Sequence, residues 1–110
     1  MYYVIELWRP RQAWRDLTAE QRTAFLSGMD ATLESLTAVG VRPVAMGRAE
    51  PLLEESPWAF YTVWRSPTRH DARRLTTADD PQMDGYFELV RISGADEGPA
   101  ALAHAMTALP

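Results

Sequence analysis

The chain of 110 residues contains no cysteine, no lysine and no asparagine, and all eleven of its cationic side chains are arginine. Without cysteine it can form no disulfide, no thiolate nucleophile and no cysteine-based zinc or iron–sulfur site. Without lysine it can form no Schiff base with pyridoxal phosphate or with a carbonyl substrate. These absences exclude several classes of covalent and metal-dependent chemistry.

Other common signals are also missing. No apolar run approaches the ~20 residues of a membrane span, and the opening residues read as a strand rather than a signal peptide. We therefore expect a cytoplasmic protein with no membrane partner. The net charge of −4 gives no general attraction to phosphate backbones, so we expect no nucleic-acid partner. No phosphate-binding glycine loop, nucleophilic-serine motif or zinc motif is present, and we expect no cofactor and no metal.

The chain does contain two segments that are aromatic at odd and even positions alike, at residues 2–8 and 58–64. A strand with one face in water alternates apolar and polar side chains, because successive side chains point to opposite sides of the sheet. Neither face of these strands suits water. One face can be covered by the chain's own helices, and the other requires a partner or a ligand.

The order of the elements predicts the fold. Strands are expected at residues 2–9, 41–49, 58–65 and 83–93, the second at an edge because of Pro43. A helix of about 20 residues begins at the N-cap Thr18 with Gln21 completing a capping box, and ends at Gly40. A short helix follows Ser66 at 67–76, a loop lies at 77–82, and an extra C-terminal helix spans 98–109. This β-α-β-β-α-β order predicts one ferredoxin-like α+β domain over residues 1–110, with a four-stranded antiparallel sheet.

Three segments carry a resemblance to known proteins: YVIELW at residues 3–8, FYTVWRSP at 60–67 and YFELV at 86–90. They resemble the dimeric α+β barrel superfamily, which holds antibiotic-biosynthesis monooxygenases, stress-responsive barrel proteins and YCII-related proteins, and within it a small uncharacterised bacterial family. The resemblance implies a homodimer whose sheets enclose a pocket. It also implies chemistry without metal or organic cofactor on aromatic, polyketide-like small molecules.

The parity of the strands predicts which side chains share a face. We expect Tyr3, Ile5 and Leu7 to lie under the helices, leaving Glu6 on the opposite face beside Glu88 of the neighbouring strand. Two carboxylates as cross-strand neighbours would titrate as a coupled pair and could serve as general acid and base. The expected aromatic surround, which would bind a flat ring, consists of Trp8, Phe60, Trp64 and Tyr86, with Trp14 as a cap over the mouth.

Each candidate has a structural alternative. Each glutamate can instead pair with Arg9, Arg48, Arg65 or Arg91. His70 is a candidate proton shuttle, but its polar neighbours favour a solvated histidine. Trp14 can pack against a neighbouring helix, and a metal site of Glu6, Glu88 and His70 is the least favoured reading.

Two functions follow from these candidates. The first is a homodimeric, cofactor-independent monooxygenase or cyclase that acts on an aromatic or polyketide-like small molecule. The second is a non-catalytic ligand-binding or accessory protein of the same fold. Hydrogen-bonded Glu–Arg pairs and an interior filled by side chains would favour the second function, whereas an open pocket with unpaired carboxylates would favour the first.

Overall fold

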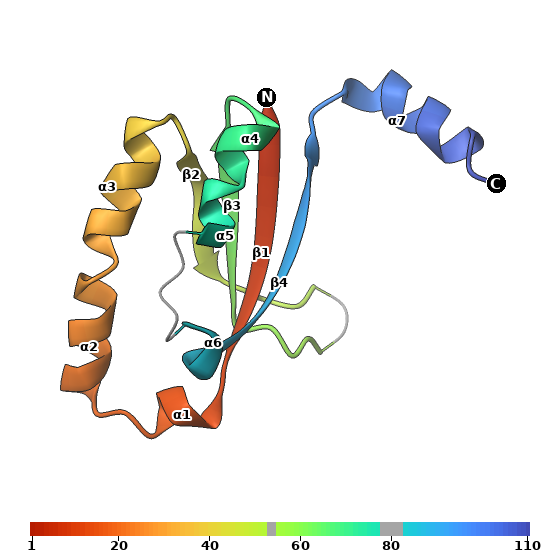
Figure 1. Ribbon diagram of the computed structural model, residues 1–110. Helices are drawn as coiled ribbons and strands as arrows, with labels where there is room; N and C mark the ends of the chain where they lie inside the picture. The colour runs from red at the N-terminus through yellow and green to blue at the C-terminus, as the bar shows by residue number, and fades with distance from the viewer. Residues whose placement is uncertain (53–54, 78–82) are drawn as a thin grey trace.

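The computed structural model describes residues 1–52, 55–77 and 83–110 of the chain (Figure 1). Its elements are, in order, β1 (Tyr2–Pro10), α1 (Gln12–Arg15), α2 (Ala19–Ser27), α3 (Asp30–Ala38), β2 (Arg42–Arg48), β3 (Phe60–Ser66), α4 (Arg69–Ala72), α5 (Arg74–Thr77), α6 (Met83–Tyr86), β4 (Phe87–Ala95) and α7 (Gly98–Thr107). Of the loop expected at 77–82, residues 78–82 lie outside the described residues.

The four strands form one antiparallel sheet in the order β2-β3-β1-β4. The first strand is central and β2 lies at an edge, as the sequence predicts. The order confirms the ferredoxin-like α+β fold, with its additional C-terminal helix.

The long helix expected after Thr18 is two helices of nine residues each, α2 and α3. They meet at Gly28 and Met29, where backbone hydrogen bonds join residues three apart: Gly28 N donates to Phe25 O and Met29 N donates to Leu26 O. Glycine is a common position for helix kinks. The expectation of one continuous helix is therefore wrong, and the break lets the pair bend alongside the sheet (Figure 1).

The two ends of this helical pair follow the sequence closely. Thr18 Oγ1 accepts a hydrogen bond from Gln21 N while Gln21 Oε1 accepts one from Thr18 N, which completes the capping box. Beyond α3, Gly40 adopts a φ of +84°, and Val41 N donates to Leu36 O in a Schellman arrangement. An added Cβ at Gly40 would lie 2.9 Å from Pro67 Cγ, so this turn packs closely against the start of the next helical segment.

One short helix is additional, and two local expectations need correction. Residues 12–15, between the first strand and the long helical segment, form the helix α1. The N-cap of α4 is Thr68, whose side chain accepts from Asp71 N, whereas Ser66 is a buried residue at the end of β3. The fourth strand begins only at Phe87, because residues 83–86 form α6 with Met83 buried.

The assignment of faces on β1 and β3 is reversed relative to the prediction. The face covered by helices carries Val4 and Glu6, and the core around Val4 is completed by Leu36, Val41, Ala72 and Leu75. The opposite face carries Ile5, which is 42% exposed. Because both faces of β1 are rich in large apolar groups, parity alone does not determine which one the helices cover.

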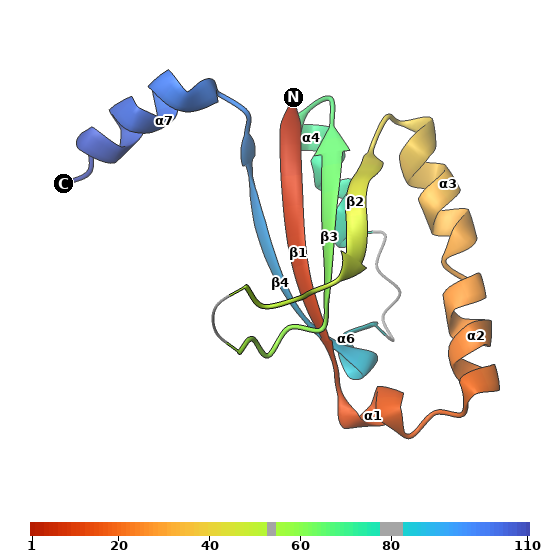
Figure 2. The same ribbon diagram turned by 180° about the vertical axis from the view of Figure 1, so that it is seen from behind.

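The helix-free face of the sheet is seen in Figure 2, where the strands lie in front of α4. Its outward side chains follow from the strand pairing and are mainly apolar: Tyr3, Ile5, Leu7, Ala45, Tyr61, Val63, Val90 and Ile92. Charged side chains lie only near the ends of this face, with Arg42 and Arg65 at one end and Arg9 and Glu88 at the other. We call this set of residues the open sheet face.

The last helix, α7, projects away from the sheet beyond β4 (Figures 1 and 2). Its apolar residues Leu102 and Met106 are both more than 60% exposed. An isolated helix of ten residues is marginal in water. Within residues 1–52, 55–77 and 83–110, no helix is long and apolar enough to cross a membrane.

Candidate functional site

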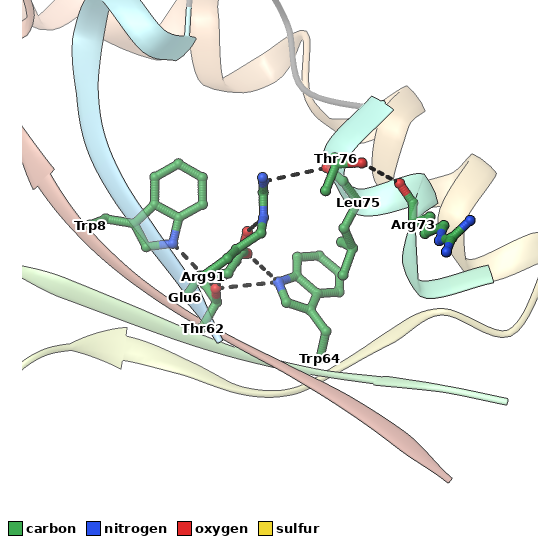
Figure 3. A network of polar contacts seen from close by, with 8 residues as sticks. All are labelled: Glu6, Trp8, Thr62, Trp64, Arg73, Leu75, Thr76 and Arg91. Atoms are coloured by element: carbon green, nitrogen blue, oxygen red, sulfur yellow. Dashed lines mark hydrogen bonds and ion pairs between the residues drawn. The ribbon is translucent and has the colours of Figure 1, made fainter. Parts of the chain in front are cut away.

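The carboxylate side chain of Glu6 lies buried in the sheet and is only 2% exposed. Its Oε1 accepts hydrogen bonds from Thr62 Oγ1 at 2.7 Å and from Trp64 Nε1 at 2.5 Å. Its Oε2 accepts from Arg91 Nε at 2.7 Å, so the carboxylate and the guanidinium form an ion pair (Figure 3). These contacts offset much of the free-energy cost of burying a charge.

Three strands assemble this network. Thr62 of β3 lies directly opposite Glu6, and Arg91 of β4 lies opposite it on the other side. Thr62 donates its proton to Glu6, and its oxygen accepts from Trp8 Nε1 at 3.2 Å. The indoles of Trp8 and Trp64 are therefore both held by the polar group between them (Figure 3). A hydrogen-bonded network of this kind fixes the orientation of the aromatic walls.

Glu88 is not beside Glu6. It pairs with Arg9 across β1 and β4 and lies on the open sheet face, where both Arg9 Nε and a terminal nitrogen contact its Oε2 at 2.5 Å. The expected carboxylate pair is wrong, because the register joins even positions of β1 to odd positions of β4. The metal site built from both glutamates is excluded by the same register. The structural alternative is confirmed: each glutamate pairs with an arginine.

The hydrogen bond from Arg9 holds the pKa of Glu88 below its ordinary value of 4.5, and the charges of Arg9 and Arg11 act in the same direction. A depressed pKa in the folded state stabilises the protein above the unfolded-state pKa, and that contribution is lost as the pH falls through the folded value. We expect an NMR titration to place the midpoint of Glu88 below 4.5, and an Arg9→Gln substitution to move it upward. An unchanged midpoint in that variant would contradict the role of Arg9.

A cavity of about 380 Å³ lies between the sheet and the helical pair α2–α3. Glu6, Trp8 and Trp64 line its sheet side, together with Thr62 and Met46, whereas residues from Phe25 to Leu36 line its helical side. This volume is within the range of small-molecule pockets, which are typically apolar with a few placed polar groups. The cavity is formed within one chain, whereas the resemblance implies a pocket enclosed by the sheets of two copies.

A second hollow of about 300 Å³ adjoins the first, since the two share Trp8, Met29 and Thr62. Its walls are almost wholly apolar and include Phe60 and Trp14. The further lining residues are Leu26, Met83 and Phe87. Together the two hollows give an aromatic enclosure with polar groups at one end.

The remaining predicted residues lie elsewhere. Tyr86 belongs to α6 and packs edge-on against Phe25 and Trp14, with ring centroids 5.0 and 5.6 Å apart. Trp14 also packs against Phe25 of α2, so it both contacts a helix and lines the second hollow. His70 is exposed on α4 and is not among the residues that line the cavity. The site therefore brings together Glu6, Trp8, Trp64, Phe60 and Trp14.

Sequence reasoning gave no role at this site to Thr62 or to the helical wall of the cavity. Thr62 is the one polar position between Phe60 and Trp64 on its face of β3, and that interruption is the signal that could have identified it. Met29 and Leu33 read as ordinary residues of an apolar helical stripe. Their contribution depends on the break at Gly28, which the pattern does not show.

The fold and this cavity define a ferredoxin-like α+β protein with a hollow of ligand size between its sheet and helices. The chain belongs to a family of unknown function, DUF6616, whose model matches residues 1–109. No curated protein matches it. Among solved structures it is similar to a dimeric protein of unknown function and ferredoxin-like fold from Bacteroides fragilis NCTC 9343, with 16% identity and a TM-score of 0.49, over 84% of this chain and 93% of that chain. The likeness is too distant to extend that protein's dimeric state to this chain.

Proposed function

We propose that this protein is a homodimer of the dimeric α+β barrel type that binds an aromatic, largely apolar small molecule in the cavity beside Glu6. The observation that carries the proposal is the 380 Å³ hollow with two tryptophans on its wall and the ion-paired carboxylate of Glu6 as a polar group. An aromatic wall favours a flat ring by offset or edge-on packing. A carboxylate oxygen has two lone pairs, so Glu6 Oε2 can accept a ligand N–H or O–H besides the bond from Arg91.

The contacts of Glu6 support ligand binding rather than acid–base catalysis. Its carboxylate is held by a guanidinium and by two neutral donors, and its expected catalytic partner, Glu88, lies on the other face of the sheet. Two coupled carboxylates could divide the roles of acid and base, but a single ion-paired one has no such partner. We therefore favour the accessory or ligand-binding function over a monooxygenase or cyclase.

The surface of the single chain supports a homodimer. The chain exposes 8053 Å², whereas a compact monomer of 12.4 kDa is expected to expose about 6,100 Å². Its radius of gyration is 16.1 Å, against about 13 Å for a compact chain of 110 residues. The projecting helix α7 (Figure 1) contributes to this excess of about 1,900 Å², which is more than the roughly 800 Å² that each partner buries in a standard interface.

The open sheet face is the surface that a second copy would cover. Its centre is apolar and its charges lie near the ends, as in interfaces with an apolar core and a polar rim. Ile92 on this face is 60% exposed in the single chain. Two identical faces can pack about a two-fold axis and cover each other, which accounts for aromatic and β-branched residues on the side that lacks helices.

Ligand binding can be tested with N-phenyl-1-naphthylamine, a neutral aromatic probe with one N–H donor. We expect its emission to rise on binding and Leu33→Trp to weaken binding about tenfold or more, because the larger side chain fills the cavity. The matched control is Leu52→Trp, the same substitution at a side chain that is 97% exposed. Equal affinity in the wild type and in Leu33→Trp would exclude this cavity as the site.

A further inference from the structure

A third hollow, of about 240 Å³, lies on the helix-covered side of the sheet between the α4–α5 segment and strands β1 and β4. Its lining differs from that of the aromatic cavity, because arginine and hydroxyl side chains predominate. The lining residues are Tyr2, Val4, Arg69, Ala72, Arg73, Thr76, Arg91 and Ser93. We call this hollow the arginine pocket.

The charge of the arginine pocket is positive in a chain whose net charge is −4. Arg91 is neutralised by Glu6. Arg69 and Arg73 make no ion pair within residues 1–52, 55–77 and 83–110, the part of the chain that the structure describes. The neighbouring carboxylate of Asp71 is used by Thr68 and Arg74. Two arginines that line the pocket are therefore without a carboxylate to balance their charges among the described residues.

One hydroxyl group of the pocket, that of Ser93, can donate a hydrogen bond to a ligand. Tyr2 Oη donates to Ser93 Oγ at 3.3 Å, which leaves the proton of Ser93 itself available to another acceptor. Thr76 donates instead to the carbonyl oxygen of Arg73 (Figure 3). A group that enters the pocket thus meets guanidinium and hydroxyl donors from β4 and from the α4–α5 segment.

We propose that the arginine pocket binds a small oxyanion of the phosphate type, either free or as the terminal group of an organic molecule. Arginine side chains can supply charge-assisted donors that match the three or four acceptor oxygens of such a group, and three arginines line this hollow. The volume admits a group of that size and the charge favours it. The pocket is separated from the aromatic cavity by the Glu6–Arg91 ion pair, so this site is additional to the one proposed above.

The test is isothermal titration with inorganic phosphate and with phenyl phosphate at pH 7 and constant ionic strength, with sodium chloride as the reference anion. We expect saturable binding of phosphate and none of chloride. Arg69→Gln and Arg73→Gln should each weaken phosphate binding about tenfold, as the loss of one charge-assisted hydrogen bond predicts. Tighter binding of phenyl phosphate would identify the anion as part of an organic ligand, and equal or weaker binding would identify a free anion.

The matched control is Arg74→Gln, which removes the same charge from the next residue along the chain. Arg74 is not among the residues that line the pocket, and its side chain pairs with Asp71. An equal loss of affinity in all three variants would show attraction by overall charge rather than a site, and would overturn the proposal. The absence of saturable phosphate binding to the wild type would overturn it as well.

A fourth variant is expected to change the phosphate affinity in the opposite direction. Glu6→Gln removes the carboxylate that neutralises Arg91 and leaves the residues of the arginine pocket in place. Because Arg91 lines the pocket, this variant should bind phosphate more tightly than the wild type, provided that circular dichroism shows a folded chain. The results expected for Arg69→Gln and Arg73→Gln do not depend on the result for Glu6→Gln. Both arginine side chains are exposed, so their replacement should leave the fold intact.

Discussion

Replacing Arg91 with leucine is expected to lower the free energy of unfolding by about 3 kcal/mol or more, because it leaves a buried carboxylate without its counter-charge. Glu6 would keep Thr62 and Trp64 as donors but would have no guanidinium within reach of Oε2. Urea denaturation of the purified protein measures the change. A loss below about 1 kcal/mol would show that the ion pair is not a main support of the fold.

The same sheet offers a matched control for this experiment. Arg9 forms an ion pair with Glu88, and both side chains are about 40% exposed, so Arg9→Leu should cost less than about 1 kcal/mol. Replacing both members of the buried pair, as in Glu6→Leu with Arg91→Met, should recover much of the stability lost in the single variant, because no uncompensated charge then remains inside. The two results together separate the effect of burial from the effect of the arginine side chain itself.

Introducing aspartate at Ile5 is expected to raise the dissociation constant of the homodimer about a hundredfold or more, because the carboxylate would be buried at an apolar interface without a partner. In a two-fold dimer each interface contains the substitution twice. Sedimentation velocity at micromolar concentration should give twice the 12.4 kDa of one chain for the wild type and 12.4 kDa for the variant.

The control for the dimer is Leu52→Asp, which adds the same charge at a side chain that is 97% exposed and lies outside the open sheet face. This variant should sediment as the wild type does. A wild-type protein that sediments as a single chain at this concentration would overturn the proposed dimer. The ligand experiment with Leu33→Trp would remain valid in that case, since the cavity is formed within one chain.

The features that the sequence predicted correctly depend on local chemistry. The capping box at Thr18 and the positive φ at Gly40 involve residues a few positions apart, and their side-chain types leave few alternatives. The edge position of β2 follows from Pro43 in the same way. The order of strands then follows from the β-α-β-β-α-β order of the elements.

The site was only partly predictable because its geometry depends on register. Trp8 and Trp64 were correctly placed on the same face as Glu6, since β1 and β3 pair even positions with even positions. Between β1 and β4 the pairing joins even with odd, and a one-residue difference exchanges Glu88 for Arg91 as the neighbour of Glu6. No residue type in either strand fixes that choice locally. The helical wall of the cavity was missed for a similar reason, since the break at Gly28 lies within an uninterrupted apolar pattern.

The Glu6–Arg91 pair forms a partition with a different compartment on each side, the carboxylate toward the aromatic cavity and the guanidinium toward the arginine pocket. An anion that attracts the Arg91 guanidinium must weaken the ion pair between Arg91 and Glu6. The carboxylate oxygens of Glu6 then become better hydrogen-bond acceptors for a ligand in the aromatic cavity. Thermodynamic linkage makes this effect on affinity reciprocal, so a ligand bound beside the tryptophans would change the affinity of the arginine pocket for the anion by the same factor. The Glu6–Arg91 ion pair would then couple the binding of two different ligands in neighbouring pockets.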